Sequence, residues 1–159
     1  MKVSFVVPGR PIGKARHRTL PLKKCRRCGA NTVKRQCRCG SYEFEFLTNI
    51  ESTPTNTRLY QNLVRMAAEE AMHGSPMLSG PLRLEATFYF QIPESRKKKL
   101  RENDPHTQRP DVSNCIKSVE DACNTVIYAD DCLLAEITGR KRWSERARTE
   151  VEIESFPQG

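Results

Sequence analysis

The chain has 159 residues, with 27 Lys and Arg against 19 Asp and Glu, and a formal net charge of +8. This length suffices for one domain with a hydrophobic core. No apolar run approaches transmembrane length and the first residues lack the pattern of a signal peptide, so we expect a cytoplasmic protein with no membrane association. The basic charge favours a nucleic-acid partner, because contacts with phosphates release counterions. A basic protein without such a partner is the alternative.

Residues 2–7 alternate polar and apolar side chains, which predicts a first strand with Val3, Phe5 and Val7 on one face. The following segment, PGRPIGKARHR, is rich in proline and glycine and therefore predicts a loop. Its cations make it either a solvated basic loop or an arm that contacts phosphates, and His17 is interpreted as surface or a DNA contact. The residues concerned are Lys14, Arg16 and Arg18.

Four of the seven cysteines lie within fifteen residues, as a C-x2-C pair followed by Gly29 and a C-x-C pair followed by Gly40. Two such turns can supply the four thiolates of a tetrahedral zinc site, although C-x-C is shorter than the usual second pair. Four free thiols are the alternative, which their reactivity disfavours. We therefore predict a structural Zn²⁺ site in a zinc-ribbon-like module at 19–52. The cations of the same module make a contact with phosphates a further alternative. The predicted ligands are Cys25, Cys28, Cys37 and Cys39.

A strand is expected around Tyr42–Phe46, followed by a helix with Thr53 as N-cap and Gly74 as its stop. The predicted core-facing stripe repeats every four residues and is widened by Tyr60 and Val64. Residues 82–92 predict the clearest strand, and two further strands are expected at 133–143 and 148–156. His106, in the basic stretch 93–110, is interpreted as a surface residue. The stripe residues are Leu59, Leu63, Ala67 and Ala71, and the strand at 133–143 is expected to present Leu133, Ala135 and Ile137 on one face.

Residues 109–131 carry the pattern that points to chemistry. Apolar side chains at spacings of 4, 3, 4 and 3, from Val112 to Val126, predict a core-facing helix with Asn114, Lys117 and Asp121 on its other side. Asp111 opens the helix and Asp130–Asp131 follow it. Clustered carboxylates repel one another unless a hard cation such as Mg²⁺ lies among them. The alternative is that each aspartate caps a helix or marks a turn.

The segment RPDVSNCIKSVEDACNTVIYADD resembles the RusA family of Holliday junction resolvases, which are common in phages and prophages. The family pattern matches Pro110, Asp111, Asn114, Lys117, Asp121, Asp130 and Asp131. The first strand, the basic loop and the segment 53–72 are also similar to the family, so the resemblance covers about 1–18 and 53–156. Residues 19–52 then form an insertion in a single nuclease domain spanning 1–159. Ser113 departs from the pattern, since the family usually has an acidic ligand there.

The resemblance implies an α+β fold, with a mixed sheet and two main helices. It also implies a homodimeric, Mg²⁺-dependent endonuclease that resolves four-way junctions by paired nicks in DNA recombination and repair. The implied catalytic residues are Asp111, Lys117 and Asp131. Magnesium would be held by Asp111 and Asp131, flanked by Asp130, with Ser113 acting through its hydroxyl or a water. Asn114 and Asp121 would have supporting roles, and Glu120 or Asp121 would compensate for Ser113. The residues expected to contact DNA are Lys14, Arg16, Arg18 and Arg109.

Two other functions remain open. Ser113 favours a protein that binds structured DNA through its zinc module and basic loops without cutting it. A nuclease of related fold with a broader choice of branched DNA is the second alternative, and unpaired cuts would distinguish it from a resolvase. Outside the zinc module, Cys115 and Cys123 are expected to fill the core, while Cys132 has no predicted role.

Overall fold

The computed structural model describes residues 1–16 and 18–156, so His17 lies outside the described residues. The chain divides into two compact units. One comprises Met1–Lys14 with Thr55–Gly159, and the other comprises Ala15–Pro54. Among the described residues, no helix is both long enough and apolar enough to cross a membrane.

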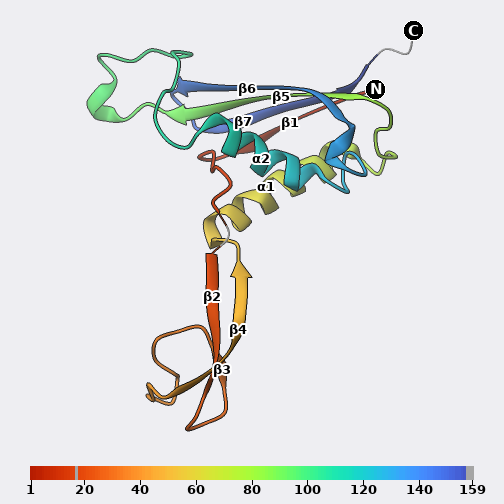
Figure 1. Ribbon diagram of the computed structural model, residues 1–159. Coiled ribbons are helices and arrows are strands. Elements are labelled where there is room, and N and C mark those ends of the chain that lie inside the picture. Colours follow the sequence, from red (N-terminus) through yellow and green to blue (C-terminus); the bar gives the residue numbers. More distant parts are fainter. Residues whose placement is uncertain (17, 157–159) are drawn as a thin grey trace. The chain divides into compact units, whose positions relative to one another are not determined.

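The larger unit is a four-stranded mixed sheet with two α-helices along one side of it (Figure 1). Strands β1 (Lys2–Pro8), β7 (Arg148–Ser155) and β5 (Leu82–Gln91) pair antiparallel, and β5 pairs parallel with β6 (Leu134–Ser144). The helices are α1 (Thr55–Met72) and α2 (Val112–Cys123). Because a parallel pair needs a crossover connection, α2 lies between β5 and β6 in the chain. The predicted α+β class is confirmed.

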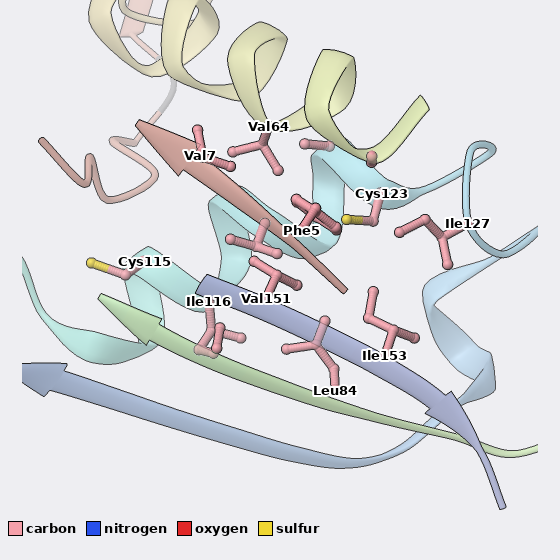
Figure 2. Close-up of a cluster of buried hydrophobic side chains, with 14 of the residues drawn as sticks. Phe5, Val7, Val64, Leu84, Cys115, Ile116, Cys123, Ile127, Val151 and Ile153 are labelled. Atoms are coloured by element: carbon pink, nitrogen blue, oxygen red, sulfur yellow. The ribbon is translucent and has the colours of Figure 1, made fainter. Parts of the chain in front are cut away.

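The core lies between the sheet and the helices, and it follows the alternation of the sequence. Val3, Phe5 and Val7 of β1 are buried, as are the alternate residues of β5 from Leu82 to Phe90. Figure 2 shows Cys115 and Cys123 of α2 among these apolar side chains. Burial raises the pKa of the Cys115 thiol to about 11 and that of Cys123 to about 12. Their predicted packing role is confirmed.

The predicted core-facing stripe of α1 is wrong in part. Tyr60 and Val64 are buried, and Ala67 and Ala71 are partly buried against the core, but Leu59 and Leu63 are 56% and 47% exposed. The buried residues of the helix are Thr57, Tyr60, Val64, Ala68 and Met72. A contact distant in sequence accounts for this difference, because the Tyr60 hydroxyl makes a buried 2.6 Å hydrogen bond with the Thr149 hydroxyl of β7. The helix begins at Thr55 and ends at Met72, before Gly74 at φ +74°.

The strand predicted at 133–143 forms as β6, but its predicted apolar face is not buried. Ala135 and Ile137 are exposed because β6 lies at the edge of the sheet. Contact with α2 occurs at Gly139, where an added Cβ would lie 2.9 Å from side-chain atoms of Ile116 and Val112. Only glycine leaves room for this approach.

His106 is buried, which corrects its predicted place on the surface. It is 6% exposed and stacks on Phe90, with ring centroids 4.0 Å apart, and also contacts Trp143 at 4.3 Å. Burial, aided by the nearby Lys141 cation, lowers the pKa of the imidazole. A neutral ring between two aromatic rings is therefore part of the core.

The smaller unit is a three-stranded antiparallel sheet in the order β3-β2-β4. Its strands are β2 (Arg18–Cys25), β3 (Asn31–Thr32) and β4 (Phe44–Ser52). Within this unit β2 and β4 form a long ribbon, with β3 and the connecting loops at one end (Figure 1). The strand expected around Tyr42–Phe46 begins at Phe44 and extends to Ser52.

Two adjacent valines of β1 provide a test of this core. Val7 is 0% exposed and Val6 is 55% exposed. We expect Val7→Ala to lower the free energy of unfolding by about 2 to 3 kcal/mol, from lost apolar burial and the cavity left behind. Val6→Ala is expected to cost less than about 1 kcal/mol. Urea unfolding followed by the fluorescence of the single, buried Trp143 measures both, and equal losses would contradict the assigned strand orientation.

Candidate metal centre and candidate active site

The four predicted zinc ligands gather at one end of the ribbon. The sulfur atoms of Cys25, Cys28, Cys37 and Cys39 lie within 4.8 Å of one another. The Cys25 and Cys39 sulfurs are 3.6 Å apart, and those of Cys28 and Cys37 are 3.4 Å apart. Tetrahedral Zn²⁺ with Zn–S bonds of about 2.3 Å places its sulfurs roughly 3.8 Å apart. This donor set and its spacing are compatible with zinc.

Two similar backbone turns hold these sulfurs in place. The Gly29 amide donates to the Cys25 carbonyl at 2.8 Å, and the Gly40 amide donates to the Cys37 carbonyl at 2.9 Å. Both glycines have positive φ angles, 75° and 84°, which a side chain would strain. The C-x-C pair therefore forms a turn comparable to the C-x2-C pair despite its shorter spacing.

The electrostatics of the cluster favour a bound cation. Hydrogen bonding from the Cys28 amide is the main cause that lowers the pKa of Cys25 to about 6. The Ala30 amide favours the Cys28 thiolate, but the neighbouring sulfurs of Cys37, Cys39 and Cys25 outweigh it and raise the pKa of Cys28 to about 12. Four thiolates cannot all be charged at this separation unless a divalent cation neutralises them.

In the larger unit, Asp111 occupies the N-cap position of α2 without capping it. Its side chain makes no capping hydrogen bond, and it is exposed. Among the described residues it has no ion-pair partner either. Since an N-cap aspartate normally accepts from the first helical amides, this carboxylate is left available for another ligand. The capping alternative does not apply to Asp111.

Asp131 lies beside Lys117 of α2. The Lys117 ammonium is 3.1 Å from the Asp131 carboxylate and 3.5 Å from that of Glu120. The hydrogen bond to Asp131 is the first cause that raises the pKa of Lys117, so the ammonium remains charged at neutral pH. The rise of the helix places the Lys117 backbone roughly 9 Å along the axis from that of Asp111. Because helical side chains tilt towards the N-terminus, the Lys117 side chain leans towards the end of the helix that carries Asp111.

Asp130 has a local structural role. Its carboxylate accepts a 2.9 Å hydrogen bond from the Cys132 amide at the start of a short 3-10 helix, Asp131–Leu133. This bond is the main cause that lowers the pKa of Asp130. The turn alternative therefore describes Asp130, and this cap orients the segment that presents Asp131.

The first half of the basic loop packs on α2. The Lys14 amide donates to the Asn114 carbonyl at 2.8 Å, and the Lys14 ammonium is 2.6 Å from the Asp121 carboxylate. A Cβ on Gly13 would lie 2.9 Å from the Pro110 Cβ and 3.1 Å from the Asn114 Cβ. Lys14 thus forms an ion pair within the protein, whereas the sequence predicted that it contacts DNA.

The remaining predicted residues are distributed as follows. Asp121 also accepts from Gln61 of α1 at 3.1 Å, so it joins α2 to Lys14 and α1 rather than to Lys117. Ser113 is exposed in the first turn of α2, and Arg109 is exposed just before it. Arg16 and Arg18 are exposed and belong to the smaller unit.

Sequence reasoning missed Lys141, which holds the segment leading into Asp111. Its ammonium donates to the carbonyls of Gln108 at 2.6 Å and Pro110 at 2.7 Å. Its own carbonyl accepts from the His106 amide at 3.1 Å. The sequence shows Lys141 only as one cation in a basic run, and nothing local to it indicates partners more than 30 residues away.

Zinc content tests the cysteine cluster. We expect about one Zn²⁺ per purified chain and its loss in Cys37→Ser, because three thiolates no longer complete the tetrahedral site. Acidification is expected to release zinc, since its thiolate ligands must be deprotonated. Cys132→Ser, at an exposed cysteine outside the cluster, serves as the matched control and keeps its zinc. Equal zinc contents in the two variants would contradict the site.

The Lys141 contacts predict a local effect of Lys141→Met. Loss of two charge-assisted hydrogen bonds is expected to weaken the segment at 105–111 by about 2 kcal/mol, which corresponds to about 30-fold faster amide exchange. Hydrogen exchange at the His106 amide measures this effect. Arg140→Met removes the neighbouring cation, which pairs with Glu85 at 2.8 Å, and is expected to leave that amide unchanged. Comparable acceleration in both variants would argue against a specific role for Lys141.

Comparison with known proteins adds independent evidence. The family model described as Endodeoxyribonuclease RusA matches residues 43–154, a range that includes α2 and Asp131 but not the four cysteines. An uncharacterized Bacillus subtilis protein, YqaN, is 30% identical over 107 residues, which cover 63% of this chain and 75% of that protein. A Lactococcus phage r1t protein named crossover junction endodeoxyribonuclease rusA is 34% identical over 74 residues. That match covers 46% of this chain and 53% of the phage protein.

The family match spans well over half of the chain and agrees with the α+β fold and with the resemblance seen in the sequence. The chain belongs to the RusA endodeoxyribonuclease family.

Proposed function

We propose that this protein is a Mg²⁺-dependent endodeoxyribonuclease that resolves four-way DNA junctions by paired symmetric nicks. The observation that carries the proposal is the state of Asp111, an exposed carboxylate at the N-cap of α2 that does not cap its helix. Family membership supports the chemistry, and so does the ion pair of 3.1 Å between Lys117 of α2 and Asp131.

The donor set suits Mg²⁺, which prefers carboxylate oxygens and retains several waters. Asp111 and Asp131 are the proposed ligands, with Ser113 contributing through its hydroxyl or a water. Glu120 is better placed than Asp121 to compensate for Ser113, because Glu120 contacts Lys117 while Asp121 is held by Lys14 and Gln61. When bound, the ion would activate a water and neutralise charge on the phosphodiester.

The protein's own residues account for the remaining steps. Water attacks phosphorus, the bond from phosphorus to the 3′-oxygen breaks, and a proton passes to that oxygen, which leaves a 5′-phosphate and a 3′-hydroxyl. Lys117, kept protonated by Asp131, would stabilise the negative charge that builds on the phosphoryl oxygens. Asp130 positions Asp131 through its cap, and Lys141 positions Asp111 through the Pro110 carbonyl.

Paired nicks on opposite strands require two active sites related by a two-fold axis, so a homodimer forms part of the proposal. Leu59, Leu63 and Met66 form an exposed apolar stripe on α1. A stripe of this kind suits contact with a second copy, since such surfaces mark sites of association.

Cleavage of a synthetic four-way junction with Mg²⁺, beside a linear duplex, tests the proposal. We expect paired nicks on the junction alone. Asp111→Asn and Asp131→Asn are each expected to slow cleavage by about a hundred- to a thousandfold, because metal stabilisation of several kcal/mol is lost. Asp121→Asn, on the same helix but bonded to Lys14 and Gln61, is the matched control and is expected to slow cleavage by less than about tenfold.

Ser113 favours a second candidate function, a protein that binds junctions without cutting them. Tight junction binding with no product at any Mg²⁺ or Mn²⁺ concentration would support that candidate and overturn the nuclease. Unpaired cuts on flaps and forks would instead indicate a broader branched-DNA nuclease.

A further inference from the structure

The smaller unit carries most of the net charge of the protein. Residues 15–54 contain nine Lys and Arg against three Glu and no Asp, a net charge of +6 out of +8 for the whole chain. The charge is also concentrated within the unit, because residues 23–38 contain seven Lys and Arg and no acidic residue. These seven cations are Lys23, Lys24, Arg26, Arg27, Lys34, Arg35 and Arg38.

The nine cations of this unit form no ion pair with an acidic residue in the part of the chain that the structure describes. In the larger unit, by contrast, Lys2 pairs with Glu152 at 2.7 Å and Arg83 pairs with Glu136 at 2.6 Å. A solvated face usually alternates charges of both signs, whereas an unpaired block of one sign fits an anionic partner.

The placement of the cations suits a rigid anion-binding surface. Six of the seven are exposed, and they lie on the end of the ribbon where the two cysteine turns are held by backbone hydrogen bonds. Lys23 is half-buried and lies 5.3 Å from the centroid of the Phe44 ring. Because the turns fix the backbone around Arg26, Arg27 and Arg38, contact with a regular array of charges costs little backbone entropy.

We propose that the cationic end of this unit, residues 23–38, binds the phosphate backbone of duplex DNA. The inference rests on the proposed function, which supplies DNA as the anionic partner. In this proposal the smaller unit binds the duplex arms of a branched substrate and takes no part in cleavage. Contacts of this kind carry no sequence preference, since phosphates position a protein without specifying bases.

The salt dependence of binding tests this surface in the full-length protein. Each phosphate contact adds about 0.9 to the slope of log K against log salt concentration. The triple variant Lys34→Gln/Arg35→Gln/Arg38→Gln is therefore expected to lower that slope by about 2 to 3 on a linear duplex and on a four-way junction. Its cleavage rate at saturating protein is expected to stay within about twofold of the unsubstituted protein.

A matched triple variant removes three cations of the larger unit that already form ion pairs. Lys2→Gln/Arg65→Gln/Lys97→Gln breaks pairs with Glu152, Glu69 and Glu94, and is expected to change the slope by less than about 0.5. Retained zinc content in the first variant shows that its cysteine turns remain folded.

Equal slopes for the two triple variants would overturn the inference, and so would a retained slope in the first variant. Failure of the proposed function has a different signature, namely that the unsubstituted protein does not cut the junction. The slope on the linear duplex still tests the cationic surface in that case. Loss of cleavage at saturation in the first variant would also contradict the inference, because it would place these residues in the chemistry.

Discussion

The close approach of α2 to its surroundings is the constraint on which the candidate active site depends. Gly139 lets Ile116 and Val112 reach β6, and Gly13 lets the loop after β1 reach Pro110 and Asn114. Contact on two sides fixes both the height and the rotation of the helix. The helix then holds the exposed Asp111 and the half-buried Lys117 at defined positions, and the short 3-10 helix brings Asp131 to Lys117.

Helix α2 and the strands that are buried on alternate residues could be predicted from the sequence, because each of their apolar patterns is compatible with only one buried face. In α2, apolar residues from Val112 to Cys123 at spacings of 4, 3 and 4 leave little freedom of rotation. In α1, two overlapping stripes fit the same period, one through Leu59 and Leu63 and the other through Tyr60 and Val64. The choice between them depends on Thr149, which lies 89 residues from Tyr60, so no local pattern could have made it.

The same distinction separates the site residues. Asp111, Lys117 and Asp131 are proposed as site residues because a family pattern marks them, whereas Lys141 acts through backbone carbonyls and has no motif. The position of His106 was predicted wrongly. A histidine within a basic, polar stretch was expected at the surface, but the aromatic rings of Phe90 and Trp143 enclose it. Burial of a neutral imidazole between rings is a tertiary property, which composition does not report.

The two units of the protein differ strongly in net charge. The larger unit retains a net charge of only +2, and its cations Lys2, Arg83 and Arg140 form ion pairs with glutamates. A cleavage site gains from such balance, because a strongly positive field around it would bind product as firmly as substrate. Under the proposed function, the cations of the smaller unit would add affinity for DNA without strengthening the ground-state contacts at the scissile phosphate. The two cysteine turns then have a role beyond the metal site, since their backbone hydrogen bonds hold the segments from which Arg26, Arg27 and Arg38 extend.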